Sequence, residues 1–357
     1  MKHRLRFLFN RVREHLWVKP LAITVISVII AFLARLADQI PSLAAVPEVT
    51  LESLNALLSI TSGSMLGVST FAVGSMLTAY ASASNSATPR SFPLVIADDV
   101  SQNALSSFIG AFIFSIVAMV ALENGYYETA GRFILFVFSL AFFAIIIFNF
   151  IRWLDRIARL GRLGNTIDKV EAVAREALLR RKHQPTLGAK EFYGQPKGLP
   201  VFANQVGYVQ RVDVPRLQET AEHFEVNIIV AALPGTFVAP DQPLAYLEEV
   251  DSDPENARMI SSVNAAFIIA KDRVYDEDPR FGLIVLSEIA SRALSPAVND
   301  PGTAIDILGS FVRLFTIWAE SDGNADVNVS ATRVYVPEIS LGDMFDDAFN
   351  AIARDGA

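Results

Sequence analysis

The sequence contains no cysteine, and only four histidines occur among its 357 residues. The lack of cysteine excludes disulfides, thiolate metal sites and cysteine nucleophiles. The histidines lie far apart, without the spacing of metal ligands, so we expect no metal site. No recognisable combination of nucleophile, general base and metal ligands occurs either. We therefore expect neither a cofactor nor an enzymatic activity.

Charge is also scarce, because charged residues make up 19% of the chain, below the roughly 25% of an average soluble protein. In its place the first half carries four long apolar stretches, at residues 21–37, 54–80, 104–122 and 133–151. Each is about long enough to cross a bilayer as a helix, which takes roughly 20 residues. Helices satisfy their backbone polar groups internally, as lipid requires. Residues 20–152 are therefore predicted to form a four-span transmembrane bundle.

Basic residues predict the orientation of these spans. The N-terminal arm, residues 1–19, is rich in Lys and Arg and has the apolar spacing of an amphipathic interfacial helix. Residues 39–53 and 123–132 carry glutamates, whereas a cluster of arginines follows residue 151. The positive-inside rule then places both termini in the cytoplasm. The net charge of −8 comes mostly from residues after Pro240, which argues against nucleic-acid binding and for the lipid bilayer as a partner.

The second apolar stretch differs from the others in its small and hydroxylated residues. These are Ser59, Ser62, Gly63, Gly67, Ser69, Thr70, Gly74, Ser75 and Thr78. In one interpretation it is the tightly packed central helix, with hydroxyls bonded to their own backbone and glycines allowing close approach. In the other it lines a water-filled path in a homo-oligomer. It contains no charged residue, which disfavours a proton relay. Arg90, just past its cytoplasmic end, is a candidate contact for a small anion or a lipid phosphate.

The second half of the chain has the composition of a soluble α+β region. A basic connector helix is expected at residues 153–187, a linker at Gly188–Pro200, a β-rich module at 198–250 and a helical region at 256–357. The module resembles the biotinyl/lipoyl hammerhead, although Asp241 stands where a second glycine is usual. It has no lysine at the attachment position. We therefore expect a structural hammerhead-like module in a cytosolic domain that follows the α-helical membrane bundle.

Turn and capping residues are concentrated in the segment Ser295–Thr303. Asp278-Pro279 and Asp300-Pro301 each place a capping residue before a helix-starting proline. Two interpretations stay open for the second of these sites. It is either a helix–helix corner or a ligand or subunit contact at a helix N-terminus. The candidate contact residues are Arg292, Ser295, Asn299, Asp300 and Thr303.

Four motifs together resemble an uncharacterised bacterial family of predicted membrane proteins, domain of unknown function twenty-two fifty-four. They are Ser-Ala-Thr-Pro89-Arg90 after the second span, Gly207-Tyr-Val-Gln with Pro234-Gly-Thr-Phe-Val, Asp278-Pro-Arg-Phe-Gly282, and Arg292-Ala-Leu-Ser-Pro-Ala-Val-Asn-Asp-Pro301. The resemblance implies membrane location and this order of domains, and it supplies no activity; we expect a multi-pass protein of the bacterial inner membrane. Members tend to continue with further helices beyond a segment like Gly342–Ala357, so we expect the natural chain to be longer.

These observations support two hypotheses. In the first, the protein is a homo-oligomer with a channel-like or transport-related role, and the second span lines or gates a path for an ion. In the second, it is a membrane-anchored sensor or scaffold whose cytosolic domain binds a small anionic ligand or a protein partner at the corner between Arg292 and Thr303.

Overall fold

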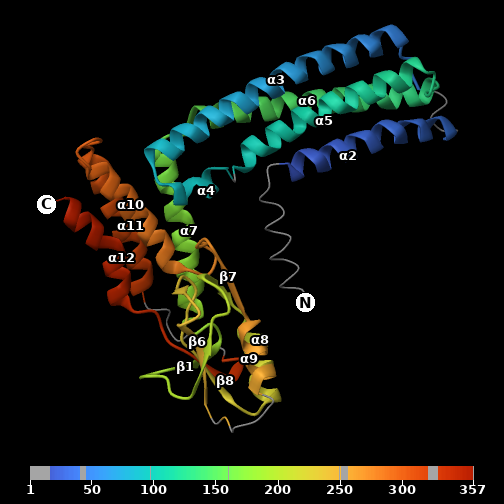
Figure 1. Ribbon diagram of the computed structural model, residues 1–357. Coiled ribbons are helices and arrows are strands. Elements are labelled where there is room, and N and C mark those ends of the chain that lie inside the picture. The colour runs from blue at the N-terminus through green and yellow to red at the C-terminus, as the bar shows by residue number, and fades with distance from the viewer. Residues whose placement is uncertain are drawn as a thin grey trace. The chain divides into compact units, whose positions relative to one another are not determined.

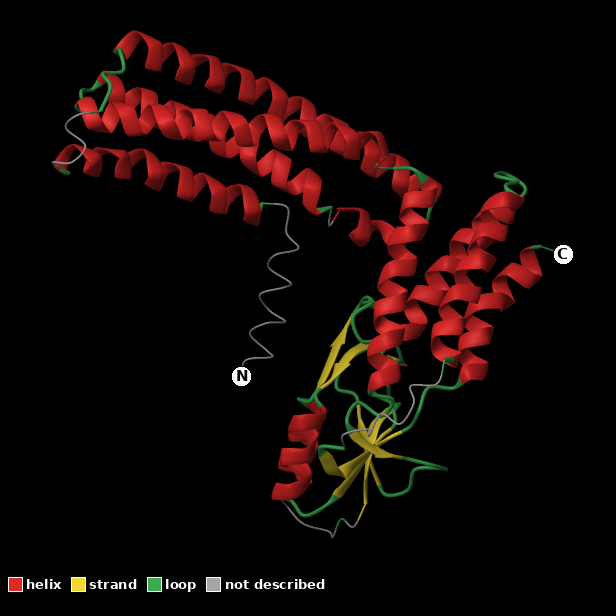
Figure 2. Cartoon of the chain, turned by 180° about the vertical axis from the view of Figure 1, so that it is seen from behind, coloured by secondary structure: helices red, strands yellow, loops and turns green. Residues whose placement is uncertain are grey.

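The computed structural model of the protein describes residues 17–40, 46–96, 98–159, 161–248, 250, 256–320 and 329–356. Most of the expected amphipathic arm, residues 1–19, lies outside this range. The chain divides into two compact units, Met1–Thr166 and Ile167–Ala357. The first unit consists of helices, whereas the second combines strands and helices (Figures 1 and 2). Each unit is described by itself below.

Long helices that run side by side form unit 1 (Figure 1). Its elements are α2 (Val18–Leu33), η1 (Ala34–Gln39), α3 (Leu51–Ser86), η3 (Pro89–Ser91), α4 (Phe92–Ile96), α5 (Asp99–Glu123) and α6 (Thr129–Arg159); α7 (Leu163–His183) then begins. Polar side chains start the helices. The side chain of Thr50 accepts a hydrogen bond from Ser53 N in α3, and that of Asp98 accepts one from Ser101 N in α5. Each cap satisfies a backbone donor that the helix itself leaves open.

The centre of unit 1 is α5, which contacts α2, α3 and α6. Small residues allow this, because Ser106, Gly110, Ala111 and Ser115 are all buried along it. A Cβ at Gly110 would lie 2.5 Å from a side-chain methyl of Ile23 in α2, so the glycine is what lets the two helices approach. The interpretation of the second span as the central helix is therefore wrong for this unit. That position belongs to the third span.

Among the described residues of unit 1, four helices are long and apolar enough to cross a membrane, and they coincide with the predicted stretches. All four extend beyond the predicted bounds, and the C-terminal extensions of α3, to Ser86, and of α6, to Arg159, are the longest. A fifth helix of sufficient length and apolarity is α11 (Pro301–Ala319) in unit 2, a segment predicted from the sequence to lie in the cytosolic region. The count of four spans therefore stays a prediction.

The described residues of unit 2 form two sheets, with a five-stranded order β1-β8-β4-β6-β2 and a three-stranded order β5-β3-β7. Its strands are β1 (Ala189–Glu191), β2 (Leu199–Phe202), β3 (Gly207–Val212), β4 (Asn227–Val230), β5 (Phe237–Val238), β6 (Pro243–Glu248), β7 (Phe267–Ala270) and β8 (Ala331–Val336). Its helices besides α7 are α8 (Val214–His223), α9 (Asn256–Asn264), α10 (Pro279–Leu294), α11 and α12 (Leu341–Asp355). In the larger sheet β8 runs parallel to β1 and β4, and β6 is antiparallel to β2 and β4.

The expectation of a purely helical chain from residue 256 onward is wrong at two places. β7 pairs with β3 of the smaller sheet, and β8 lies between β1 and β4 of the larger one. Both segments are short and rich in β-branched or aromatic residues, a composition that favours strands. The strands with which they pair are distant in sequence. The local pattern, in which helical segments flank both, therefore did not predict them. The residues expected to form the linker contain β1 and the start of β2.

The strands of the predicted hammerhead-like module are divided between the two sheets. β2, β4 and β6 belong to one sheet, β3 and β5 to the other, and strands from outside residues 198–250 complete both. Outside the sheets, α7 packs on α10, where a Cβ at Gly282 would lie 2.3 Å from Ala174 Cβ. α10 in turn contacts α11 and α12.

Candidate functional site

The candidate residues on α3 divide between two faces of this helix. Ser62 and Ser69 are buried among the apolar residues that pack against the rest of unit 1, and Ser75 is half-buried. Ser59, Gly63, Gly67, Thr70, Gly74 and Thr78 are exposed. At about 100° per residue, these six positions form one stripe, which we call the small-residue stripe. It lies roughly opposite the packed face, so the structure does not bring all the candidates together.

Several hydroxyls on α3 bond to their own helix. Ser62 donates to Ser59 O at 3.0 Å, Thr70 to Leu66 O at 3.0 Å and Thr78 to Gly74 O at 3.0 Å. This is the pattern that a hydroxyl adopts in an apolar helix. Ser69 differs, because its buried hydroxyl has no hydrogen-bond partner among the described residues. The hydroxyls of the small-residue stripe keep their lone pairs available as acceptors.

The small-residue stripe is open along its length. A Cβ added to Gly63, Gly67 or Gly74 would have no atom within 4 Å outside the helix itself. Larger side chains flank it, with Leu66 and Leu77 on one side and Ile60 and Phe71 on the other, all more than half exposed. The outer face of α6 is different, since Phe143, Ile145, Phe148 and their exposed neighbours are bulky.

Charged side chains in unit 1 lie at the ends of its helices. Asp98 is 3% exposed and receives Arg156 Nε at 2.7 Å, and Lys19 forms an ion pair with Asp99. At the opposite ends of the helices, Asp38 accepts hydrogen bonds from Glu128 N and Gly131 N at 3.0 and 2.6 Å. This carboxylate thereby caps the N-terminus of α6 from another element. Arg90 lies in η3 and is exposed, and its backbone N–H donates to Thr88 Oγ1 at 3.1 Å.

The predicted corner between α10 and α11 is built largely from its own capping bonds. Asp300 Oδ1 accepts from Thr303 N at 3.1 Å and Oδ2 accepts from the Thr303 hydroxyl at 2.6 Å, so the pKa of Asp300 lies below its usual value. Ser295 donates to Arg292 O, and Asn299 N donates to Ser295 O. Asn299 adopts a φ of 50°, in the left-handed region that asparagine tolerates better than most residues. This geometry accounts for the motif as a helix–helix corner.

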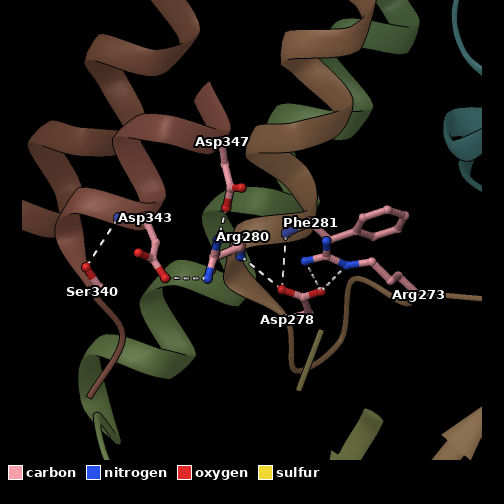
Figure 3. Close-up of polar contacts among 7 residues, drawn as sticks. All are labelled: Arg273, Asp278, Arg280, Phe281, Ser340, Asp343 and Asp347. Atoms are coloured by element: carbon pink, nitrogen blue, oxygen red, sulfur yellow. Dashed lines mark hydrogen bonds and ion pairs between the residues drawn. The ribbon is translucent and has the colours of Figure 1, made fainter. Parts of the chain in front are cut away.

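A second cluster of charges, not singled out by the sequence analysis as a site, surrounds the start of α10 (Figure 3). Asp278 is 2% exposed and caps this helix by accepting from Arg280 N and Phe281 N, both at 3.2 Å. Arg273 places Nε and Nη2 each 2.7 Å from Asp278 Oδ2. Burial raises the pKa of Asp278, while these donors act in the opposite direction. Four donors therefore occupy about all the lone-pair sites of this carboxylate.

Arg181 of α7 lies beside this cluster and is only 3% exposed. None of its guanidinium nitrogens has a hydrogen-bond partner among the described residues. Burial lowers its pKa to about 10, although the charges of Glu277, Asp278 and Glu338 oppose the shift. Glu277 lies 3.2 Å from Arg211 Nε, and burial raises the pKa of Glu277 to about 7. A buried guanidinium without a partner is rare, because its five donors lose water without replacement.

The structure brings together motifs that are far apart in the sequence. A Cβ at Gly235, which has a φ of +92°, would lie 2.4 Å from Asp278 Oδ2. Gly235 N donates to Val209 O at 2.8 Å, and the guanidinium of Arg273 lies 5.9 Å from the ring centroid of Tyr208. Two of the four motifs that carry the family resemblance, the one that contains Tyr208 and Gly235 and the one that begins at Asp278, thus meet around Asp278. The Asp-Pro pair was visible in the sequence as a helix start, but nothing local signalled the burial of Arg181.

Within the described part of the chain, no group of three or more His, Cys, Asp and Glu residues is placed to hold a metal ion. The charges around Asp278 are instead paired with arginines. Two carboxylates of α12 are likewise paired with an arginine: Arg280 of α10 contacts Asp343 at 2.8 Å and Asp347 at 2.5 Å (Figure 3). The part of this arrangement that is buried is Asp278 with Arg181 beside it, and the guanidinium of Arg181 has no hydrogen-bond partner among the described residues.

Comparison with known proteins agrees with the apolar helices of unit 1. Uncharacterized proteins of Mycobacterium bovis and Mycobacterium tuberculosis are each 32% identical to this chain over 116 residues. The aligned segment covers 31% of this chain and 22% of the relatives' length. No solved structure matches. Residues 13–357 match the family described as "Predicted membrane protein (DUF2254)", and the chain therefore belongs to this family of predicted membrane proteins.

Proposed function

We propose that the protein is a homo-oligomer in the membrane, that its copies meet along the small-residue stripe of α3, and that the assembly has a channel-like or transport-related role. The observation that carries this proposal is the open space at Gly63, Gly67 and Gly74. Glycine costs up to about 1 kcal/mol relative to alanine inside a helix, so three on one lipid-facing stripe contribute no stability to the protomer. They do allow a second helix to approach closely.

The chemistry of the stripe suits an uncharged path for a small ion. Ser59, Thr70 and Thr78 alternate with the glycines on the same face, and hydroxyl oxygens can replace part of a hydration shell. Charged side chains of the described bundle are confined to its ends, at positions such as Asp38 and Arg156. We therefore assign the protein no proton-relay chemistry and no catalytic activity.

The test combines oligomer counting with electrical recording. Native mass spectrometry of the purified protein should give a closed oligomer, and planar bilayers containing it should show unitary currents. Gly67→Leu should reduce both, because the added side chain fills the stripe. Ala144→Leu on the exposed face of α6 is the matched control and should leave both unchanged. A monomer that gives no current under varied voltage, osmotic tension and pH would contradict the proposal.

We further propose that four helices cross the bacterial inner membrane, with both termini in the cytoplasm, and that α11 does not cross it. Lys19, Arg156 and Arg159 lie at one set of helix ends, which favours the cytoplasmic side. In α11, Ile307, Phe311 and Leu314 are fully buried within unit 2.

Cysteine labelling tests this topology, because the chain contains no cysteine of its own. An impermeant maleimide should modify Glu128→Cys in intact cells and His183→Cys only after permeabilisation. The reverse pattern would invert the topology.

A second candidate function is that of a sensor whose unit 2 binds a small anion at Arg181. The partnerless guanidinium favours it, because Asp278 is already saturated by four donors. Inorganic phosphate at constant ionic strength should raise the melting temperature of the wild-type protein. Arg181→Met should abolish that shift, and Arg181→Lys, which lacks the planar fork, should weaken it. An equal shift in all three proteins, or none in the wild type, would exclude this site.

A further inference from the structure

The described surface of unit 1 contains an apolar cavity between α2 and α5. Its volume is about 380 Å³, within the roughly 300–1,000 Å³ typical of ligand sites. Phe32 of α2, four apolar residues between Ile116 and Ala121 of α5, and Asn124 and Tyr126 of the following turn line it. Ile116, Val120 and Phe32 are between 36% and 54% exposed. The cavity is therefore an open groove on a face of the bundle that lipid would cover, and we call it the α2–α5 groove.

One end of the groove has the features of a membrane interface. Tyr126 and Tyr127 lie in the turn after α5, and their ring centroids are 5.3 Å apart. Such aromatic residues concentrate where the acyl chains meet the headgroups. The Tyr126 ring contacts Phe32 edge-to-face at 5.8 Å. The guanidinium of Arg35, about one turn beyond Phe32, lies 4.5 Å from the centroid of the same Tyr126 ring. A cation is thus held beside the mouth of an apolar groove.

We propose that the α2–α5 groove is a binding site for a membrane phospholipid, with an acyl chain in the groove and the phosphate at Arg35. Apolar walls give an acyl chain dispersion contacts that an empty groove would lose. A guanidinium matches phosphate oxygens in a planar, two-point geometry. The combination of an apolar slot with a cation at one end fits a phospholipid better than a neutral lipid, which lacks the anionic group.

Native mass spectrometry after exchange into mild detergent tests the proposal. The wild-type protein should retain one phospholipid per protomer. Val120→Trp fills the groove and should reduce the retained lipid at least tenfold, whereas Ile145→Trp, on the exposed outer face of α6, should retain it like the wild type. Arg35→Gln should weaken retention about fivefold, as expected from about 1 kcal/mol per basic residue near an anionic headgroup. Equal retention by both tryptophan variants would overturn the site.

A second measurement does not depend on how the variants fold. Wild-type protein is loaded with a phospholipid that carries a photoreactive acyl chain, washed with detergent to remove loosely held lipid, and only then irradiated. The label should concentrate on the peptide that contains residues 116–126. Labelling spread evenly over α3 and α6, or no label after the wash, would show an adventitious lipid only and would overturn the proposal. A diacylglycerol that competes as well as the phospholipid would refute the role of Arg35.

Discussion

The two units of this chain place their charges in opposite ways. In unit 1, ionised side chains lie at the ends of the helices, as Asp38 and the Asp98–Arg156 pair do. Between those ends, hydroxyls such as those of Ser62, Thr70 and Thr78 bond to the backbone of their own helix. In unit 2, Arg181 and Asp278 are 3% and 2% exposed and lie beside the start of α10.

The difference reflects the surroundings that each unit must satisfy. Lipid offers no hydrogen bonds. A charge within a membrane-spanning helix can therefore be compensated only by other groups of the helices themselves. In the topology proposed above, unit 2 lies in water, where a charge can be buried when partners replace the lost hydration, as Arg273 and two backbone N–H groups do for Asp278. Four substitutions or titrations test this contrast, and they are given from the largest expected effect to the smallest.

Removing Asp278 should give the largest loss of stability. Asp278→Ala leaves Arg273 buried without its partner and removes the cap of α10, and breaking a buried pair in this way costs roughly 3–5 kcal/mol. Thermal unfolding of the full chain should show a lower transition for unit 2. Asp343→Ala is the control, because this carboxylate is 52% exposed and an exposed pair contributes about 0–1 kcal/mol. Equal losses from both variants would show that burial of the charge is irrelevant.

Glu277 should make the stability of unit 2 depend on pH near neutrality. Burial raises its pKa to about 7, and Arg211, Asp276, Arg180 and Arg181 face it. The folded state then binds the proton more tightly than the unfolded chain. Stability from this group is full below about pH 4.5 and is lost as the pH rises through 7, by on the order of 1–3 kcal/mol.

The measurement is the unfolding midpoint from pH 4.5 to 8 for the wild type and for Glu277→Gln. The variant should show a flatter profile over this range. The pKa assigned to Glu277 would be wrong if the two profiles were parallel.

The cap at Asp38 should contribute less than the buried pair of unit 2. Asp38→Ala removes the acceptor for Glu128 N and Gly131 N, and losing a helix cap costs typically about 1 kcal/mol. Circular dichroism in detergent should record a small decrease in the melting temperature of unit 1. A decrease as large as that of Asp278→Ala would mean that charges at the helix ends matter as much as buried ones.

Ser69→Ala should have the smallest effect. The hydroxyl is buried without a partner among the described residues, so removing it relieves a desolvated polar group and should leave stability unchanged or raise it by up to about 1 kcal/mol. Leu58→Ala, at a position 1% exposed on the same helix, should instead cost roughly 2–5 kcal/mol. A large loss from Ser69→Ala, measured by the same thermal unfolding, would indicate that this hydroxyl has a partner.

Much of the architecture was predictable because it depends on local pattern. The four apolar helices of unit 1, the connector helix and the capping roles of Asp278 and Asp300 follow from hydrophobic runs and from residues that satisfy open backbone donors. The strands β7 and β8 were missed, because each becomes a strand through partners elsewhere in the chain. The cluster around Asp278 was missed for the same reason.

The sequence by itself determined that this is a helical membrane protein with a mixed α+β second half, since length and apolarity suffice to recognise a span. Only the tertiary structure decided which face of α3 is left open, which helix occupies the centre of unit 1, and that Arg181 is buried. The effect of a glycine or a serine on the helix that contains it is the same whichever face of that helix the residue lies on. Which face packs depends on contacts with helices distant in the chain, and no local pattern contains those contacts.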